Sequence, residues 1–232
     1  MTKIELLAVD LDGTLVDSAP DLAYCVDIAL ASVGLPPPAI ERTRAWIGDG
    51  IERLLQRAFA FYGERDDTPA FGAAVERFSA CYLDNLFVRS TLYPGVIETL
   101  ARLGDEGVAL ACVTNKRAAF ADGVLTAAGI RDHFGALYGG DSLLEKKPHP
   151  SQLLAAAHAL GVRAANAAMV GDSHHDYDAA AAAGFAFVWA AYGYCQRIDA
   201  RSGVPIARID AFSELTPALL DAAGREHARR PC

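Results

Sequence analysis

The chain has 232 residues, of which 52% are hydrophobic and 22% are charged, a balance that is typical of a folded globular protein and excludes a wholly disordered one. The formal net charge of −8 argues against general binding to nucleic acid or anionic membrane, so we expect neither as a partner. The five cysteines form no CxxC pair and the N-terminal residues do not resemble a signal peptide, so we expect reduced thiols and a cytoplasmic location.

The first predicted element is a buried strand. The apolar run over 4–9 ends at Asp10 and is typical of a parallel strand that is covered on both faces. In the stretch that follows, apolar residues recur at helical spacing within the segments 22–33, 51–61 and 71–87. Turns rich in proline and glycine separate these segments. The pattern predicts a block of helices inserted after the first strand.

From Tyr93 onward, helix and strand signals alternate. Predicted helices cover 95–106, 117–128, 151–160 and 176–183, and predicted strands cover 108–113, 136–139, 167–170 and 185–190. This alternation predicts a parallel sheet with helices on both faces, followed by a fraying tail over 221–232. We therefore expect an α/β protein with a doubly wound core over 1–16 and 91–232 and an inserted α-helical cap domain over 17–90.

Polar side chains stand where the predicted strands end. Asp10 and Asp12 follow the first strand, Thr114 follows the second, Lys147 lies in a later loop, and Asp172 and Asp176 follow the strand over 167–170. In an open parallel sheet these ends share one edge, where ligands bind. Each acid alone could be a turn residue or a helix N-cap, but capping does not explain two acids that flank Leu11 and a second such pair later in the chain.

These residue types suit phosphoryl transfer. A carboxylate can act as the nucleophile and form an aspartyl-phosphate, provided that the negative charge of the phosphate is neutralised. Mg²⁺ prefers carboxylate and carbonyl oxygens, and a lysine supplies a point charge near the transferred group. We therefore expect a Mg²⁺-dependent phosphatase that acts on a small phosphomonoester.

Four motifs in this order resemble those of the haloacid dehalogenase-like superfamily. They are Asp10-Leu11-Asp12-Gly13-Thr14, Thr114-Asn115-Lys116, Lys147-Pro148 and Gly171-Asp172-Ser173-His174-His175-Asp176. The resemblance covers the chain from residue 4 to about 190 and implies a Rossmann-like core with a helical cap.

The resemblance also implies a role for each matching residue. Asp10 would be the nucleophile and a metal ligand, and Asp12 would be the general acid and base and bind the metal through its backbone carbonyl. The residues that would complete the phosphate and metal sites are Thr114, Asn115, Lys147, Asp172 and Asp176. Dehalogenases of this superfamily lack the second aspartate, and a leaving alkoxide needs a proton whereas a halide does not, so Asp12 favours phosphate chemistry.

Three features of the motifs leave questions open. Lys146 stands beside Lys147, and we choose Lys147 because it directly precedes Pro148. We interpret Lys116 as a solvated residue at a helix start. We interpret His174 and His175 as a loop or helix-start feature, with a role for His175 in orienting the acids as the alternative.

The bacterial phosphoglycolate phosphatases are the subfamily that the sequence resembles most, through weaker signals around the motifs. In the predicted cap, the loop Gly48-Asp49-Gly50 is the expected substrate loop, because glycines permit close backbone approach. The alternative is that these glycines merely separate two helices. Arg44 and Arg53 could bind a substrate carboxylate, or could be solvated helix residues.

The expected reaction is therefore hydrolysis of 2-phosphoglycolate. The alternatives are another sugar-phosphate phosphatase, for example one for N-acetylmuramic acid 6-phosphate, a β-phosphoglucomutase-like phosphotransferase, and a non-catalytic domain that retains the fold. The phosphatases and the phosphotransferase share the core motifs, so these motifs do not distinguish between them. We expect a monomer or a homodimer.

Overall fold

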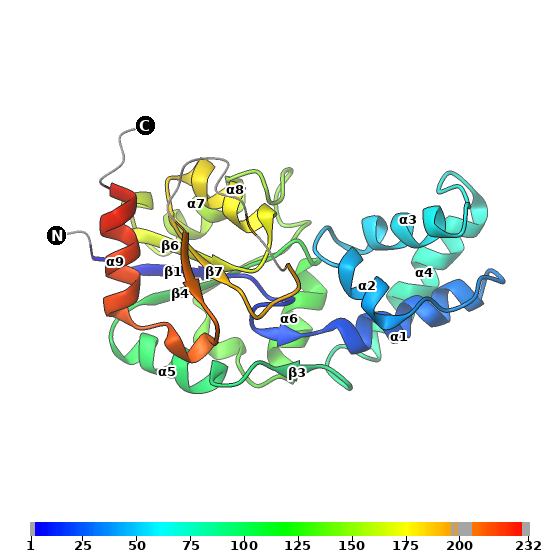
Figure 1. Cartoon of the computed structure of the whole chain (residues 1–232), viewed down its shortest axis with the longest axis horizontal. Helices are drawn as coiled ribbons and strands as arrows, with labels where there is room; N and C mark the ends of the chain where they lie inside the picture. The colour runs from blue at the N-terminus through cyan, green and yellow to red at the C-terminus, as the bar shows by residue number, and fades with distance from the viewer. Residues whose placement is uncertain (1–2, 196–197, 199–205, 229–232) are drawn as a thin grey trace.

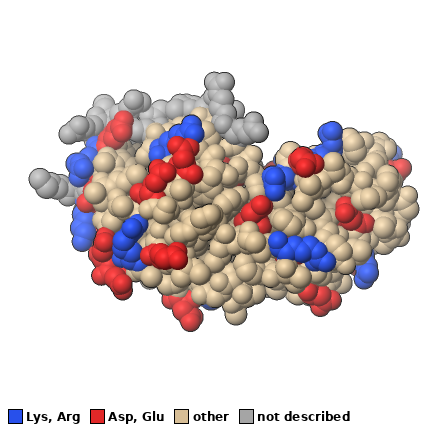
Figure 2. All heavy atoms as spheres, turned by 60° about the horizontal axis from the view of Figure 1, so that its bottom comes forward, with Lys and Arg blue, Asp and Glu red and all other residues tan. Residues whose placement is uncertain are grey.

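The computed structural model describes residues 3–195, 198 and 206–228. A core that contains a twisted sheet lies at one end of the molecule, and a group of helices lies at the other (Figure 1). On the face shown in Figure 2, acidic and basic side chains are interspersed, and the outline is indented where the two parts meet. Among the described residues, none of the helices has the length and apolar character needed to cross a membrane.

The core contains a six-stranded parallel sheet with the strand order β5-β4-β1-β6-β7-β8. The strands are β1 (Leu6–Val9), β4 (Ala109–Val113), β5 (Ala136–Tyr138), β6 (Ala167–Gly171), β7 (Ala186–Ala190) and β8 (Ile206–Ile209). Leu6 and Ala8 point to one face of the sheet, and Leu7 and Val9 point to the other, and all four are fully buried. The continuous apolar run predicted for a strand covered on both faces is confirmed.

Helices cover both faces of this sheet, as expected for a doubly wound fold. The core helices are α5 (Val96–Asp105), α6 (Ala118–Ala127), α7 (Ser151–Ala159), α8 (His174–Ala183) and α9 (Pro217–Ala228), and the 3₁₀ turns are Arg131–His133, Ala164–Asn166 and Phe212–Glu214. Buried residues of α5, α6 and α9 pack with Leu7 and Val9, whereas those of α7 and α8 pack with Leu6 and Ala8. The predicted α/β fold class is thereby confirmed.

The C-terminal region departs from the sequence prediction. Residues 221–228, expected in a fraying tail, belong to helix α9, and the tail's last residues, 229–232, lie outside the described part of the chain. Leu220 and Ala223 of α9 are buried against the sheet. The helix was missed because only its narrow inner face is apolar and its last turn is charged. Strand β8 was also missed, because four residues with an arginine among them carry little periodic signal.

Four helices form the second part of the molecule. They are α1 (Ala19–Ala31), α2 (Ile40–Trp46), α3 (Ile51–Phe61) and α4 (Pro69–Leu83). The chain enters through β2 (Val16–Asp17) and returns through β3 (Thr91–Leu92), and these two strands pair in an antiparallel ribbon. This ribbon lies near both predicted boundaries of the cap, whose role as a separate domain stays a prediction.

A buried carboxylate ties the returning chain to the first helix of this group. Asp21 of α1 is fully buried and accepts hydrogen bonds from the backbone N–H groups of Val88, Arg89 and Ser90 at 2.9–3.0 Å and from the Ser90 hydroxyl at 2.6 Å. These bonds hold the pKa of Asp21 below its usual range although burial opposes them. The two chain crossings between core and helices are therefore fixed to each other.

Candidate active site

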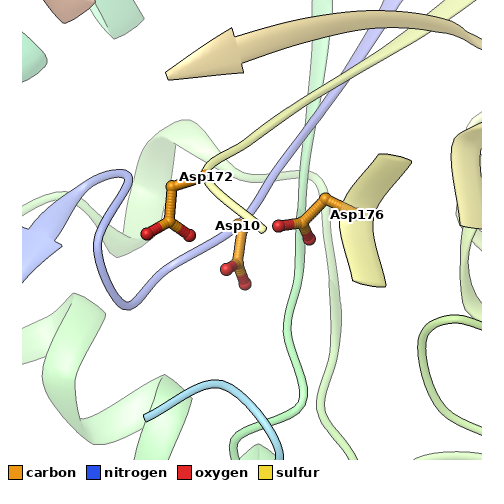
Figure 3. Close-up of side chains that lie close together, drawn as sticks. All are labelled: Asp10, Asp172 and Asp176. Carbon is orange, nitrogen blue, oxygen red and sulfur yellow. The ribbon is translucent and has the colours of Figure 1, made fainter. Parts of the chain in front are cut away.

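Three carboxylates converge at the carboxyl ends of two neighbouring strands. Asp10 directly follows β1, Asp172 directly follows β6, and Asp176 lies in the first turn of α8. Each offers an oxygen within 4.8 Å of the others, and Figure 3 shows the three side chains turned toward one another. Because β1 pairs in parallel with β6, with Val9 opposite Val170, the residues that follow these strands meet at one edge of the sheet.

Asp176 is held in place by the start of its own helix. Ser173 is the N-cap of α8, and its backbone N–H and hydroxyl donate to one oxygen of Asp176 at 3.0 and 2.6 Å. This reciprocal capping box orients the carboxylate and leaves its second oxygen turned toward the acid cluster. Asp176 is thus the N3 residue of the capping box and not the N-cap itself, and it belongs to the acid cluster as well.

Lys147 provides the positive charge within this cluster. Its ammonium group donates to Asp10 at 2.9 Å, to Asp176 at 2.6 Å and to the backbone carbonyl of Val113 at 2.6 Å, which uses all three of its protons. Burial lowers the pKa of Lys147, but the two carboxylates outweigh it and hold that pKa above its usual value. Lys146, the sequence alternative, instead donates to the backbone carbonyl of Asp49 at 2.7 Å.

The cluster has too little positive charge for its acids. Burial raises the pKa of Asp10 to about 6, with Lys147 opposing the effect and Asp176 adding to it. Burial, followed by the negative charges of Asp10 and Asp176, raises the pKa of Asp172 well above its usual value. One ammonium facing three buried carboxylates leaves room for a cation with hard-oxygen preferences, so the donor set fits Mg²⁺.

Asp12 is not one of the three clustered acids and has partners of its own. Its carboxylate accepts from Lys116 Nζ at 2.6 and 2.8 Å and from the Ser18 hydroxyl at 2.5 Å. The expectation that Lys116 is solvated is wrong: it is 6% exposed, and its ammonium lies 5.0 Å from the ring centre of Tyr82 in α4. Nothing in the sequence near Lys116 indicates these contacts, because Asp12 and Tyr82 come from distant parts of the chain.

Thr114 and Asn115 follow β4 at the same edge, and both are buried. The amide nitrogen of Asn115 donates at 3.0 Å to the backbone carbonyls of Gly48 and Lys147. One side chain thus fixes the predicted substrate loop to the loop that carries the buried lysine. Its amide oxygen is buried without a hydrogen-bond partner in the described structure.

The Gly48-Asp49-Gly50 loop lies against the core. Gly48 and Gly50 have φ angles of 126° and 87°, a region that favours glycine. The Asp49 carboxylate accepts from His175 Nε2 at 2.7 Å and also binds Arg57. The hydrogen bond from His175 is the main cause that holds the pKa of Asp49 below its usual range, and Arg57 adds to it. Asp49 in turn raises the pKa of His175. His175 therefore links the core to the loop over 48–50.

The two arginines proposed for a substrate carboxylate lie in different places. Arg44 borders the acid cluster's larger cavity and pairs with Asp17 at 3.4 Å. Arg53 is exposed, donates to Gln56 at 3.1 Å, and lines a separate surface hollow beside Glu64. The structure does not bring Arg53 to the acids, so we leave it out of the site proposed below.

Two cavities meet at Asp10 and Asp12. The larger, of about 350 Å³, extends between the acids and the cap arginines Arg44 and Arg57. The smaller, of about 40 Å³, runs from Asp10 into the helical part of the molecule. Its lining residues are Asp10, Asp12, Leu22, Ile47, Gly48, Gly50, Ile51, Leu54, Tyr82, Thr114, Asn115 and Lys116. The acids thus stand at the junction of a wide opening lined by several charged residues and a narrow, mostly apolar recess.

Glycines pack directly against the acids. A Cβ atom at Gly13, where φ is 83°, or at Gly193 would lie 2.3 Å from Asp172 atoms, and one at Gly171 would lie 2.3 Å from Asp176 Cγ. The backbone N–H of Tyr194 donates to Asp172 at 2.6 Å. The segment after β7 therefore completes the wall of the site.

Comparison with known proteins gives long matches. The sequence matches the haloacid dehalogenase-like hydrolase family over residues 4–184. A phosphoglycolate phosphatase of Nitrosococcus oceani is 44% identical over 221 residues, covering 94% of this chain and 98% of that protein. One from Pectobacterium atrosepticum is 39% identical over 217 residues, covering 94% of this chain and 93% of that protein.

Solved structures agree with these matches. The crystal structure of a predicted phosphoglycolate phosphatase from Haemophilus somnus has 39% sequence identity and a TM-score of 0.85, and the match covers 92% of this chain and 97% of that one. The similarity extends over the core and the helical insert alike, and the resemblance drawn from the four motifs is confirmed. The chain belongs to the haloacid dehalogenase-like hydrolases.

Proposed function

We propose that this protein is a Mg²⁺-dependent phosphatase that hydrolyses 2-phosphoglycolate to glycolate and phosphate through an aspartyl-phosphate. The observation that carries the chemistry is the buried convergence of Asp10, Asp172 and Asp176 within 4.8 Å, with Lys147 Nζ 2.9 Å from Asp10. Support for the substrate comes from the names of relatives that are up to 44% identical over most of the chain. We further propose a cytoplasmic location.

In the first step, a carboxylate oxygen of Asp10 attacks the phosphorus atom. The bond between phosphorus and the ester oxygen breaks, its electron pair goes to the glycolate oxygen, and Asp12 gives that oxygen a proton. In the second step, the ionised Asp12 takes a proton from a water molecule whose oxygen attacks the same phosphorus. The Asp10 carboxylate then leaves, inorganic phosphate forms, and both acids regain their starting states.

The remaining residues position and neutralise charge. Lys147 holds the Asp10 carboxylate at 2.9 Å and would face the phosphate as a point charge, and the Thr114 hydroxyl and the Asn115 backbone would bind phosphate oxygens. Asp10, Asp172 and the backbone carbonyl of Asp12 would hold Mg²⁺, supported by Asp176. The metal would supply the positive charge that lets an anionic nucleophile approach an anionic ester.

The helical insert over 17–90 is proposed to act as a cap that sets specificity. Its loop over 48–50 lines both cavities beside Asp10, and closing it excludes water from the phosphoryl group. The recess of about 40 Å³ favours a leaving group of a few atoms.

A panel of phosphate esters tests this function. We expect kcat/KM for 2-phosphoglycolate to exceed that for glycerol phosphate, glucose 6-phosphate, β-glucose 1-phosphate and N-acetylmuramic acid 6-phosphate by at least about tenfold, or about 1.4 kcal/mol of transition-state discrimination. A higher kcat/KM for one of the sugar phosphates would contradict 2-phosphoglycolate as the substrate but would still support a phosphatase. Conversion of β-glucose 1-phosphate to glucose 6-phosphate would instead favour the phosphotransferase.

A further inference from the structure

The recess beyond Asp12 contains a buried cation in mostly apolar surroundings. Lys116 comes from the core, on the segment after β4, and its ammonium lies 5.0 Å from the ring centre of Tyr82 on α4 of the helical insert. The Tyr82 ring also packs edge-on against Phe120 of α6, with ring centroids 5.3 Å apart. The other walls of the recess on the insert side are apolar: Leu22, Ile47, Ile51 and Leu54.

The polar groups of this recess are incompletely satisfied. The Tyr82 side chain is fully buried, and Lys116, which donates to Asp12 at 2.6 and 2.8 Å, also lies beside the Tyr82 hydroxyl. An ammonium can only donate, so within the described structure the proton of the Tyr82 hydroxyl has no acceptor. A buried hydroxyl whose proton has no acceptor is costly, so this geometry calls for an additional acceptor in the recess.

We propose that Lys116 and Tyr82 form the subsite for the carboxylate of the leaving group, and thereby select esters that carry an acidic group one carbon from the ester oxygen. The inference rests on the proposed phosphatase function and adds the residues that recognise its substrate. Asp12 lies between the two regions: it shares the entrance with Asp10 and is bonded to Lys116. An ester oxygen protonated by Asp12 would therefore have its carboxylate within reach of Lys116.

The chemistry of the recess matches such a group. A carboxylate taken into an apolar cavity must meet a cation and hydrogen-bond donors, and Lys116 and the Tyr82 hydroxyl are of these kinds. A neutral alkyl group would leave the Tyr82 hydroxyl without an acceptor and would leave Asp12 as the only carboxylate beside the Lys116 ammonium. Size selects in the same direction, because about 40 Å³ accommodates a carboxymethyl group of four heavy atoms.

The test compares 2-phosphoglycolate with its carboxamide analogue, which has the same shape and no charge on the leaving group. We expect the wild-type protein to prefer the carboxylate by about 100-fold in kcat/KM, and Lys116→Met to reduce this preference at least about 20-fold, chiefly by raising KM for the carboxylate. The ratio cancels any loss common to both substrates, such as one caused by removing the partner of Asp12.

Two further variants make the result specific. Tyr82→Phe keeps the ring packing and removes only the hydroxyl, so it should lower the preference about three- to tenfold with no loss of fold by circular dichroism. Lys146→Met removes the same charge from a nearby lysine, whose ammonium binds the Asp49 carbonyl, and should leave the wild-type preference unchanged.

The outcomes separate this inference from the proposed function. A wild-type preference for the carboxylate that survives both Lys116→Met and Tyr82→Phe within about threefold would overturn the subsite and leave the substrate standing. Equal rates of the wild-type protein on the carboxylate and the carboxamide would overturn the substrate together with the subsite. Loss of the preference in Lys146→Met as well would overturn the assignment to Lys116.

Discussion

Two sides of the candidate site differ in the interactions that hold them. We call the core side, with Asp10, Asp176 and Lys147, the floor, and the loop over 48–50 the roof. On the core side, Asp10, Asp176 and Lys147 are buried, and short bonds of 2.6–2.9 Å join them. On the cap side, the loop over 48–50 meets the core through three polar links from Asn115, Lys146 and His175. The floor thus consists of buried charges in direct contact with one another. The roof is a glycine-containing loop that a few hydrogen bonds attach to the core.

This difference fits the work that each region has to do. Charges that stabilise a transition state act best when they are fixed before the substrate arrives. Under the proposed function, the roof opens and closes once in each turnover. A few exchangeable hydrogen bonds allow such a movement, whereas a large buried interface would hinder it. Partly exposed ion pairs such as His175–Asp49, whose side chains are 34% and 18% exposed, contribute about 0–1 kcal/mol each. We therefore expect substitutions in the floor to change chemistry and those in the roof to change closure.

The largest effect should come from Asp10→Asn. Asparagine keeps the shape but is too poor a nucleophile, so turnover should fall about 10⁴-fold or more. Because burial raises the pKa of Asp10 to about 6, the neutral side chain should leave the metal-free melting temperature unchanged or higher. Hydrolysis of p-nitrophenyl phosphate and thermal unfolding measure both effects. Exposed Asp122→Asn is the control, and appreciable turnover by folded Asp10→Asn would contradict the aspartyl-phosphate.

Metal removal should have the next largest effect. Activity should fall to background in EDTA and return with Mg²⁺, whereas Ca²⁺ should inhibit, because its more flexible coordination misplaces the nucleophile. Mg²⁺ should also raise the melting temperature, by an amount equivalent to about 2.7 kcal/mol at a concentration of 100 times Kd. Asp172→Asn should lose most of this shift. Full activity after thorough chelation would show that the floor works without a metal.

Asp12→Ala should have an intermediate effect that depends on the leaving group. An alkyl phosphate needs protonation of its leaving oxygen, so its hydrolysis should fall about 10²–10⁴-fold, and p-nitrophenyl phosphate should suffer less because its leaving group is stable as an anion. Rapid-quench measurement of the phosphoenzyme would separate its formation from its hydrolysis. Equal losses on both esters would mean that Asp12 serves the loop and not proton transfer.

The smallest effect concerns the roof and its pH dependence. Asp49 raises the pKa of His175, so the bridge is fully formed below about pH 6.5 and is lost as the pH rises through the folded pKa. The pKa of Asp49 is lowered, so its contribution is present above about pH 3.9 and is lost as the pH falls further. The bridge should thus be strongest between these limits.

His175→Asn should accordingly lower the melting temperature by less than about 4 °C near pH 5.5, and by less still at pH 9. Exposed His158→Asn is the matched control and should show no such dependence. In activity, His175→Asn should change KM more than kcat if the roof governs closure. A loss of kcat alone would place His175 with the floor.

Much of the floor could be predicted from sequence, because Asp10 and Asp172 directly follow strands and Asp176 lies four residues after Asp172, in the first turn of the next helix. Parallel pairing of β1 with β6 then brings Asp10 and Asp172 together, whatever path the chain takes between the two strands. The choice of Lys147 rested on the adjacent proline, and in the structure its ammonium contacts two of the acids. The alternation of helix and strand signals likewise predicted the sheet through β7.

The roof could not be predicted in this way, because its contacts join segments that are far apart in the chain. Lys116 was expected in solvent, since nothing near it in sequence announces that Tyr82 will cover it. Arg53 was chosen for its charge and its closeness to the glycine loop, but the turn of α3 carries it to the outer surface. His175 meets Asp49 across the boundary between the two parts of the chain. Only the folded arrangement reveals these neighbours.

The glycines that press against the acids have a consequence for natural variation. Gly13, Gly171 and Gly193 take no part in the proposed chemistry, yet a single methyl group at any of them would occupy space held by Asp172 or Asp176. Alanine there would displace a carboxylate as surely as a substitution of the aspartate itself. Natural selection should therefore remove substitutions at these three glycines as strictly as substitutions of the acids. A survey of tolerated variants would then identify residues that surround the site without contacting the substrate.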